Sequence, residues 1–397
     1  MDLYPARVRW ALYALFVGAS VLNFLDRQVL AALAPQLMRE FSLTKGQYGD
    51  ILLAFSLTYA ALAPLAGWLI DRAGLARSSV LLVGLWSLAG MSMGLAGSFG
   101  ALLAARAFLG AAESGSISLS SKANALYLAP RERSVGTAVN QVGLALGAIL
   151  APWLGQALAD AYGWRWAFIV PGALGFLWIP AWLAASRRFP AAAPAPQARE
   201  SHWDLLRDPR FWLLLAANMA VMTIYTLWVN WTTVFLVTHH GMTQAAANQR
   251  LAWIPQVFGT AGGLLGGWLS LRWASGEGGV TRARLRACFW GALLAAVIAL
   301  LPYSPTPGVS TAGICVSFFA CLIVSVNLYA LPLDFFGAGR AAFATAGLTA
   351  SYGVLQAVFS PVAGRVVDRF GFAPLFTAVA LLPLAGYALL RAAGRRR

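Results

Sequence analysis

Long apolar runs recur along the whole chain, and they constrain its fold more than any other feature. Hydrophobic residues make up 59% of the 397 residues and charged residues only 11%, whereas about a quarter of the residues of a soluble domain are charged. A helix of about 20 apolar residues crosses the hydrocarbon core of a bilayer. These runs are too long for the strands of a membrane barrel, so the sequence predicts an all-α membrane protein.

The runs predict twelve membrane-spanning helices in two halves. Residues 187–208 combine basic residues with an Ala/Pro run, and we interpret them as a cytoplasmic central linker. The predicted domains are therefore an N-terminal six-helix bundle (1–186), the linker (187–208) and a C-terminal six-helix bundle (209–397). The predicted spans are 8–36, 48–70, 78–97, 100–128, 134–159, 165–186, 209–238, 246–271, 285–302, 309–334, 341–367 and 372–391.

The distribution of positive charge predicts the orientation of the chain. Of its 29 Lys and Arg residues, 20 fall in or beside segments that are cytoplasmic if the N-terminus is inside, six fall in or beside external segments, and three, Arg27, Arg106 and Lys122, lie within spans away from their ends. This bias predicts a multi-pass protein of the inner membrane with both termini in the cytoplasm. The formal charge of +15 is dispersed over loops and tails rather than gathered in one patch, so no nucleic-acid partner is expected.

The two halves also resemble each other in sequence. The segments PWLGQALADAYGWRWAF (152–168) and PVAGRVVDRFGFAPLF (361–376) share a Pro, a Gly three residues later, and a further Gly, aromatic residue and Phe. Repeats of this kind mark a large class of secondary transporters. The chain shows no nucleophile–base pair, metal-ligand cluster or phosphate loop, so we expect neither an enzyme nor a bound cofactor or metal.

Closely spaced glycines occur in two of the predicted spans. Gly143 and Gly147 lie in VGLALG, and Gly262 and Gly266 lie in AGGLLGG. Small residues four apart let membrane helices approach each other closely, so we expect tight helix contacts at both places.

Four ionisable residues lie within the predicted spans of the first half. Asp26 and Arg27 occur in NFLDRQVL, and Arg106 and Glu113 are seven residues apart on one helix face. Such residues usually face the bundle interior and mark substrate or proton paths. Burial disfavours an ionised carboxyl and a nearby cation favours it, so Asp26 and Glu113 are candidate proton carriers, with Arg27 as tuning or pairing cation. Arg106 offers a planar fork for a carboxylate.

A structural interpretation of the same four residues stays open at this point. They can form buried ion pairs, for example Arg27 with Glu113, with Asp26 bound to another polar group. Neighbours in a helix point about 100° apart, so Asp26 and Arg27 are poorly placed to pair with each other.

The loop between the second and third spans reads GWLIDRAGLAR. Its spacing resembles the loop signature of the major facilitator superfamily, G-x-L-x-D-R-x-G-x-x-R. The glycines allow close approach of helix ends, and the Asp can pair with basic residues or cap a helix. We predict a gate latch or a helix–helix staple formed by Gly67, Asp71, Arg72, Gly74 and Arg77.

Several segments together resemble one branch of that superfamily. NFLDRQVLAALAPQL, the Arg106/Glu113 spacing, APRERSVGTAVNQVGLALGAILAP and GWRWAFIVPGALGFLWIPAWL are similar to the anion:cation symporter family, most of all to its bacterial hexuronate transporters. The similarity is dense over 20–185. Members of that family import sugar acids and other organic anions, commonly with protons.

The resemblance implies roles for individual residues. Asp26, Glu113 and Arg27 match its proton-coupling positions, and Arg106 matches its substrate-carboxylate arginine. Tyr59 and Gln141 match polar positions of the sugar-acid pocket. Lys122 fits a lysine of hexuronate-type members, but it can equally extend to the cytoplasmic end of its helix.

The second half departs from the family pattern in its aromatic seventh span. Asn230 and Asn327 are candidates for binding substrate hydroxyls, while Tyr225, Trp228 and Trp231 can stack on a ring face. Aromatic residues in membrane helices also serve packing or interface roles. A cavity with so many aromatic rings favours an aromatic or less hydroxylated acid.

The sequence thus predicts a symporter that imports an organic anion with protons by alternating access, driven by the proton gradient and acting as a monomer. One alternative is an importer of an aromatic or short monocarboxylate. Another is an exporter of lipids or drug-like amphiphiles, because N-x-x-D-R in the first span also resembles spinster-like transporters.

Overall fold

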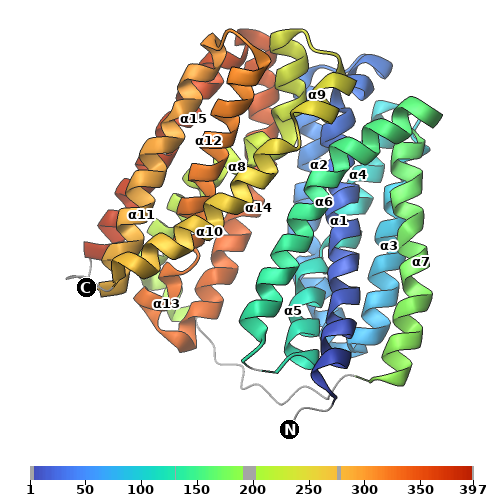
Figure 1. Cartoon of the computed structure of the whole chain (residues 1–397), viewed down its shortest axis with the longest axis vertical. Coiled ribbons are helices and arrows are strands. Elements are labelled where there is room, and N and C mark those ends of the chain that lie inside the picture. The colour runs from blue at the N-terminus through green and yellow to red at the C-terminus, as the bar shows by residue number, and fades with distance from the viewer. Residues whose placement is uncertain (1–3, 130, 191–202, 275–278, 396–397) are drawn as a thin grey trace. The chain divides into compact units, whose positions relative to one another are not determined.

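The predicted all-α architecture is confirmed by the computed structural model of the chain. The structure describes residues 4–129, 131–190, 203–274 and 279–395, and every regular element within these ranges is a helix (Figure 1). Each of the twelve predicted spans coincides with one helix or with two consecutive ones. Residues 191–202 of the predicted linker lie outside the described residues.

The chain is divided into two compact units. The first comprises residues 1–43 and 50–197, and the second comprises 44–49 and 198–397. The first unit holds most of α2 and six further helices. The helices are α1 (Ala6–Glu40), α2 (Lys45–Ala73), α3 (Leu75–Gly94), α4 (Phe99–Glu113), α5 (Ser116–Tyr127), α6 (Arg133–Tyr162) and α7 (Trp166–Arg188).

The second unit contains the remaining helices and two 3₁₀ segments. Its first element is a short 3₁₀ helix, η1, and its last is the C-terminal helix α15. The elements are η1 (Trp203–Arg207), α8 (Pro209–His240), α9 (Gln244–Arg250), α10 (Ile254–Ala274), α11 (Gly279–Ala295), η2 (Ala296–Tyr303), α12 (Pro307–Leu328), α13 (Leu331–Phe336), α14 (Ala338–Phe370) and α15 (Phe372–Arg395).

Four of the predicted spans, 100–128, 246–271, 285–302 and 309–334, each coincide with two consecutive elements. Nine helical segments in the described part of the chain are long and apolar enough to cross a membrane, and two of them, Gly279–Tyr303 and Pro307–Phe336, each join two consecutive elements. The span 100–128 is not among them, because it divides into α4 and α5, of 15 and 12 residues. Helices α10 and α14 are not among the nine segments found in the described residues either, and both contain several glycine and hydroxyl residues.

The glycine pairs form the predicted close contacts. In the first unit, a Cβ on Gly147 of α6 would lie 2.5 Å from the backbone oxygen of Val21 in α1. In the second unit, a Cβ on Gly262 of α10 would lie 2.2 Å from the backbone oxygen of Phe319 in α12. No larger residue fits at these distances, so glycine sets the separation of both helix pairs.

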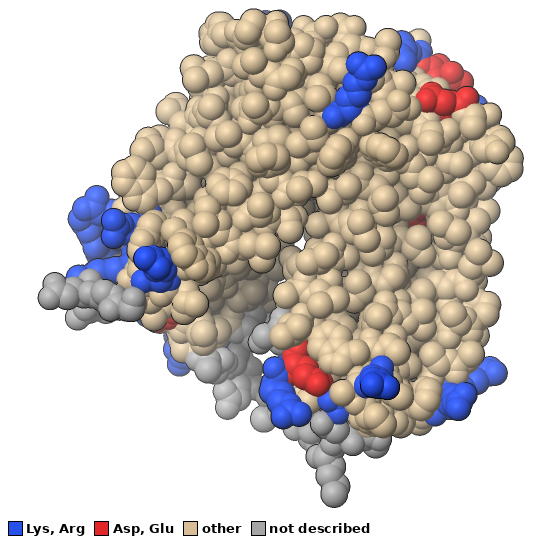
Figure 2. Space-filling view, in the orientation of Figure 1, with Lys and Arg blue, Asp and Glu red and all other residues tan. Residues whose placement is uncertain are grey.

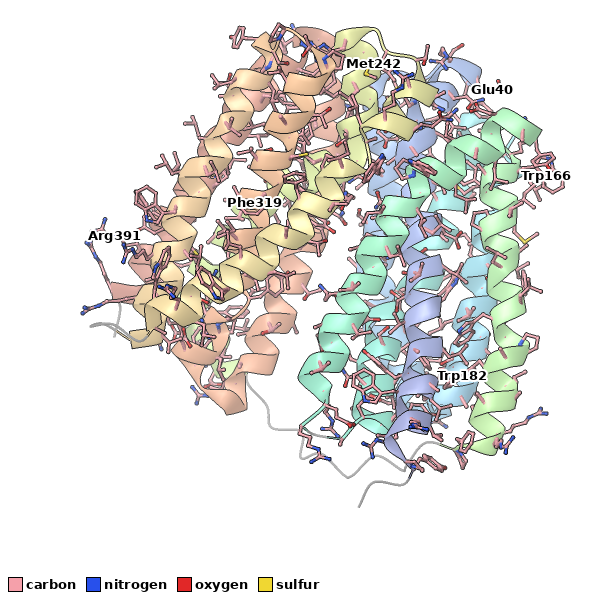
Figure 3. All side chains as sticks on the ribbon, viewed as in Figure 1. Glu40, Trp166, Trp182, Met242, Phe319 and Arg391 are labelled. Atoms are coloured by element: carbon pink, nitrogen blue, oxygen red, sulfur yellow. The ribbon has the colours of Figure 1, made fainter. Side chains whose placement is uncertain are left out.

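Aromatic side chains fill one end of the first unit. Trp178 and Trp182 of α7 stack with ring centroids 5.5 Å apart, and Phe16 of α1 packs edge-on against Trp182 at 4.6 Å. The indole of Trp178 donates to the backbone oxygen of Leu15 at 2.7 Å, so its polar group is satisfied. Figure 3 shows Trp182 and Trp166 at opposite ends of α7, which places this aromatic cluster away from the Trp166 end.

Charged residues gather mainly at the helix ends on the face that Figure 2 shows, and other residues form the broad middle of each unit. An ion pair links the start of α1 to Glu132. Arg9 at the start of α1 donates to both carboxylate oxygens of Glu132, at 2.8 and 2.9 Å. The hydrogen bond from the Ala129 N–H lowers the pKa of the Glu132 carboxyl below its ordinary value, and Arg9 adds a smaller effect in the same direction.

Candidate functional site

A buried ion pair between α1 and α4 forms the centre of the candidate site. Arg27 donates from Nε at 3.0 Å and from Nη2 at 2.7 Å to the same oxygen, Oε2 of Glu113. The Glu113 side chain is 0% exposed and that of Arg27 is 19% exposed. The other oxygen, Oε1, accepts no hydrogen bond from the residues that the structure describes. The pairing predicted by the structural interpretation is therefore present.

Aromatic rings surround the guanidinium of Arg27. Its Cζ lies 4.7 Å from the ring centroid of Phe55, 5.1 Å from that of Tyr59 and 5.3 Å from that of Phe24. Phe55 and Tyr59 are one turn apart on α2 and stack on each other with centroids 5.6 Å apart. A cation over aromatic faces is attracted by the ring quadrupole, so these rings stabilise Arg27 where water is scarce.

Arg106 of α4 lies against the same ring. Its Cζ is 4.6 Å from the centroid of Phe55, and its Nη2 donates to the backbone oxygen of Arg27 at 3.3 Å. Arg106 is 2% exposed. Two guanidinium groups thus lie against a single phenyl ring, which is 4% exposed, and one of them pairs with the Glu113 carboxylate.

Asp26 faces a different neighbour. It is 4% exposed, and a Cβ on Gly90 of α3 would lie 3.5 Å from its Oδ2 and 3.8 Å from the Cα of Gly172 in α7. Within the described residues, no hydrogen bond or ion pair reaches this carboxyl. The expectation that Asp26 has its own polar partner is therefore wrong for this conformation, because the helix turns its side chain toward two glycines.

The helix carrying Arg106 and Glu113 ends at Glu113 itself. Ser114 and Gly115 form a turn, and α5 begins at Ser116. A Cβ on Gly115 would lie 2.6 Å from Cδ1 of Leu82, so the turn packs tightly against α3. Both predicted ionisable residues of this span are buried on α4, as the seven-residue spacing predicts.

Lys122 lies with the loop motif rather than with the buried arginines. Its Nζ donates to Oδ1 of Asp71 and to the backbone oxygen of Ile70, each at 2.9 Å. Ile70 belongs to the last turn of α2, where carbonyl groups favour a cation. Of the two interpretations, these contacts favour extension toward the helix end, and the substrate contact stays a prediction.

The rest of the loop motif forms a tight corner. Gly74, the single residue between α2 and α3, has φ +79°, a conformation that side chains disfavour. Arg72 lies over the ring of Trp68 at 5.7 Å, and both Arg72 and Arg77 are exposed. Nothing lies within 4 Å of a Cβ placed on Gly67, so the close helix approach expected at this glycine is absent among the described residues.

In the second unit, Asn230 and Trp231 of α8 are buried. The Asn230 side chain donates to the backbone oxygen of Thr226 at 2.9 Å. Trp231 packs edge-on against Tyr48, which belongs to the same unit, with centroids 5.2 Å apart. Its indole N–H has no acceptor among the described residues, which makes Trp231 the better placed of the two to gain a hydrogen bond.

Asn327, Trp228 and Tyr225 have packing contacts. The Asn327 amide donates to the backbone oxygens of Gly266 and Ile323, at 3.1 and 2.9 Å, and so links α12 to α10. Trp228 donates to Ser317 at 2.8 Å, and Tyr225 stacks on Phe318. These contacts favour a structural role for Asn327 over the predicted contact with substrate hydroxyls, because its N–H groups are already used.

Sequence reasoning missed some residues that the structure brings into the site. Phe55 and Phe24 carry no signal that separates them from packing residues, and only the register between helices reveals them. Ser20 was also missed, and it hydrogen-bonds Asn140 at 2.8 Å across α1 and α6. Gln141, the predicted pocket residue next to Asn140, is exposed on α6.

The arrangement can bind an anion and exchange a proton, and its donor set does not suit a metal. Glu113 is the acid nearest the two arginines, and no group of three or more His, Cys, Asp or Glu residues with metal-site geometry occurs in the described part of the chain. Two guanidinium groups are suited to a carboxylate or another planar anion.

Comparison with known proteins shows the family. Residues 16–349 match the sequence profile of the Major Facilitator Superfamily. The hexuronate transporter of Escherichia coli K12 is 30% identical over 96% of this chain and 92% of its own length. The galacturonate transporter of Dickeya chrysanthemi is 28% identical over 66% of this chain and 82% of its own length.

Solved structures show the same fold. A bacterial homologue of the human lysosomal transporter Spinster, in an inward-facing and occupied conformation, matches with a TM-score of 0.83 over 99% of this chain and 98% of that chain, at 19% identity. The apolar helices, the paired units and the sequence matches agree with one another. The chain is a multi-pass membrane transporter, not an enzyme, and it belongs to the Major Facilitator Superfamily.

Proposed function

We propose that this transporter imports an organic anion, a sugar acid such as a hexuronate or an aldonate, together with protons by alternating access. The observation that carries the proposal is the fully buried Glu113 carboxylate, ion-paired with Arg27 beside the buried Arg106. The similarity to transporters named for hexuronate and galacturonate supports this class of substrate.

Glu113 is the proposed proton carrier that senses substrate. Both hydrogen bonds from Arg27 end on one of its oxygens, so protonation of Glu113 removes the charge that holds Arg27 in place. Asp26 is the proposed second proton carrier, because an isolated ionised carboxylate is costly to bury. Protons taken up from outside and released inside would then drive the cycle, and no cofactor is needed.

Arg106 is the proposed anchor of the substrate carboxylate, with Tyr59 and Gln141 as polar groups for the sugar. A cationic side chain inside a membrane is energetically costly, so such residues usually pair with an anionic group or take part in transport. The buried Arg106 and the partly buried Arg27 therefore favour an anionic cargo over the lipid or drug-like cargo of the alternative interpretation. The fold similarity to the Spinster homologue carries no information about cargo at 19% identity.

The location and the gate follow from the same proposal. The excess of Lys and Arg in alternate loops supports insertion in the inner membrane with both termini in the cytoplasm. The loop motif then lies on the cytoplasmic side, where Lys122 and Asp71 hold the end of α2 as part of the gate. A monomer suffices for this mechanism.

The test is proton movement into proteoliposomes that contain a pH-sensitive dye. Glucuronate, galacturonate, galactonate, lactate and benzoate are added outside in turn. We expect a sugar acid to acidify the interior, and Arg106→Ala and Glu113→Gln to abolish that signal. Arg165→Ala is the matched control, because its side chain is 47% exposed and pairs with Glu40 only at 3.9 Å.

The outcome that contradicts the proposal is equally concrete. If none of the five acids moves protons through the wild-type protein, proton-coupled anion import is wrong. If an apolar ligand binds and Arg106→Ala leaves its affinity unchanged, the exporter interpretation replaces it. If lactate or benzoate alone acidifies the vesicles, the transporter is selective for a short or aromatic monocarboxylate.

A further inference from the structure

The ring of Phe55 lies against both arginines of the candidate site, Arg27 and Arg106. Its centroid is 4.7 Å from Cζ of Arg27 and 4.6 Å from Cζ of Arg106. We propose that Phe55 is a positioning residue that links the two arginines, so that the charge on Glu113 sets how Arg106 is held for the substrate. This inference rests on the proposed function.

The backbone of Phe55 is held firmly at this place. A Cβ on Gly110 of α4 would lie only 2.3 Å from the backbone oxygen of Phe55. Three residues further along α2, the hydroxyl of Thr58 donates to the backbone oxygen of Ala107 in α4 at 2.8 Å. The backbone that carries the ring is therefore packed closely against α4. The two arginine side chains are longer and have more rotatable bonds, so they are the parts of the cluster that can change position.

A shared ring makes the two arginine positions depend on each other. The phenyl quadrupole attracts each guanidinium, while the two guanidinium groups repel each other. Arg106 also donates to the backbone oxygen of Arg27 at 3.3 Å, so both groups occupy one small region. If Arg27 moves over the Phe55 ring, it changes both the electrostatic potential at the Arg106 guanidinium and the volume open to the Arg106 side chain.

The carboxyl of Glu113 controls where Arg27 sits. In the charged state, Glu113 binds Nε and Nη2 of Arg27 through Oε2. In the protonated state that attraction is lost, and the rings of Phe55, Tyr59 and Phe24 become the stronger attraction for Arg27. Arg27 then competes more strongly for Phe55, which releases Arg106 toward a substrate carboxylate. Proton binding and anion binding thereby become coupled.

The decisive experiment replaces the Phe55 ring by phenylalanine with one, two and three ring fluorines. Fluorination weakens the negative face of the ring with little change in shape, so folding and packing are kept. Labelled glucuronate and galacturonate uptake is measured in proteoliposomes, both as accumulation driven by a pH gradient and as counterflow without a gradient. We expect accumulation to fall stepwise with fluorine number, by roughly three- to tenfold at three fluorines, while counterflow continues.

Conventional variants provide controls. Phe55→Leu is expected to lose accumulation, and Phe55→Tyr to keep it. Phe168→Leu is the matched packing control, since Phe168 is also buried, at 3% exposed, and packs on Trp164 rather than on a buried arginine. Phe24→Leu removes a ring whose centroid lies 5.3 Å from Cζ of Arg27, farther than that of Phe55 at 4.7 Å, so we expect its effect on accumulation to be smaller than that of Phe55→Leu.

The outcomes separate this inference from the proposed function. A wild-type protein that accumulates a sugar acid with protons, together with fluorinated variants that accumulate it equally well, overturns the role of Phe55 and leaves the proposed function intact. A wild-type protein that shows no proton-driven accumulation overturns both. Equal loss of accumulation and counterflow shows that Phe55 serves packing or binding alone, and it also overturns the inference.

Discussion

The ion pair between Arg27 and Glu113 predicts strong energetic coupling between the two residues. Glu113→Gln keeps an acceptor for the hydrogen bonds at 3.0 and 2.7 Å but removes the charge. Arg27→Gln leaves a carboxylate that is 0% exposed without its cation. Removing one partner of a buried ion pair costs about 3–5 kcal/mol. Arg27→Gln should reach this range, and Glu113→Gln should fall below it, because aromatic rings still hold the guanidinium.

The double variant Arg27→Gln/Glu113→Gln distinguishes coupling from two independent losses. Removing both charges avoids the cost of leaving one charge buried without its partner. We therefore expect it to be more stable than Arg27→Gln alone, with a coupling energy of at least about 2 kcal/mol.

Thermal unfolding in detergent measures these differences. One kcal/mol corresponds to about 2–4 °C in Tm for a unit of 150–250 residues, so Arg27→Gln should lower Tm by about 6–20 °C. The exposed pair Arg165–Glu40 is the control, with an expected coupling below about 1 kcal/mol. If the costs of the two buried substitutions simply add, within about 0.5 kcal/mol, the reasoning from this ion pair is refuted.

Three further predictions concern other parts of the first unit. Because the pKa of Glu132 is lowered in the folded state, its stabilising contribution is complete above its unfolded pKa of about 4.3 and is lost as pH falls through the lower folded value. Protection from hydrogen exchange at the start of α1, taken relative to the intrinsic exchange rate at each pH, should thus fall below about pH 4 in the wild type and show no such fall in Glu132→Gln. Lys122→Met should slow transport yet leave substrate affinity within about twofold, since Lys122 binds the 67% exposed Asp71, a pair worth under about 1 kcal/mol; a tenfold loss of affinity would support the substrate role. Gly147→Ala should cost about 1–3 kcal/mol, whereas Gly18→Ala, with nothing within 4 Å of its Cβ, should not destabilise; equal thermal stability of the two variants would count against the packing argument.

Hydropathy was sufficient to predict the twelve spans, because a chain that crosses the hydrocarbon core of a membrane must satisfy its own backbone hydrogen bonds and therefore forms long apolar helices. It could not place the interruptions, such as the turn at Ser114 and Gly115, since a two-residue break changes the mean hydropathy very little. The sequence ESGSIS does contain the turn-forming residues. Local composition thus held a signal for the break that a search for long apolar runs overlooks.

The candidate site was predictable to the level of helix faces. The seven-residue spacing of Arg106 and Glu113 places both on one side of α4, and both are buried there. The choice of Glu113 rather than Asp26 as partner of Arg27 depends on how α1 and α4 are positioned along each other, which local sequence does not encode. Lys122 shows the same limit, because a long side chain can reach in two directions and only the position of Asp71 decides between them.

The two buried acids of α1 and α4 differ in their surroundings, and this difference predicts opposite effects on stability. Glu113 is paired with a cation, so its neutral analogue loses an attraction. Asp26 faces Gly90 and Gly172 and receives no hydrogen bond or ion pair from the described residues. A buried carboxylate without a partner is unfavourable when ionised, so Asp26→Asn should keep Tm at or above the wild-type value.

Transport measurements on Asp26→Asn distinguish an effect of the substitution on transport from an effect on stability. If Asp26 carries a proton in each cycle, Asp26→Asn removes proton-driven accumulation while the protein stays as stable as the wild type. Asp26→Leu, of similar size but without polar atoms, tests whether the glycine-lined space also has to accept a polar group. A large fall in Tm for Asp26→Asn would mean that the carboxylate has a stabilising partner in the membrane. Its role would then be that of a structural ion pair, and Glu113 would be left as the sole proton carrier of the proposed mechanism.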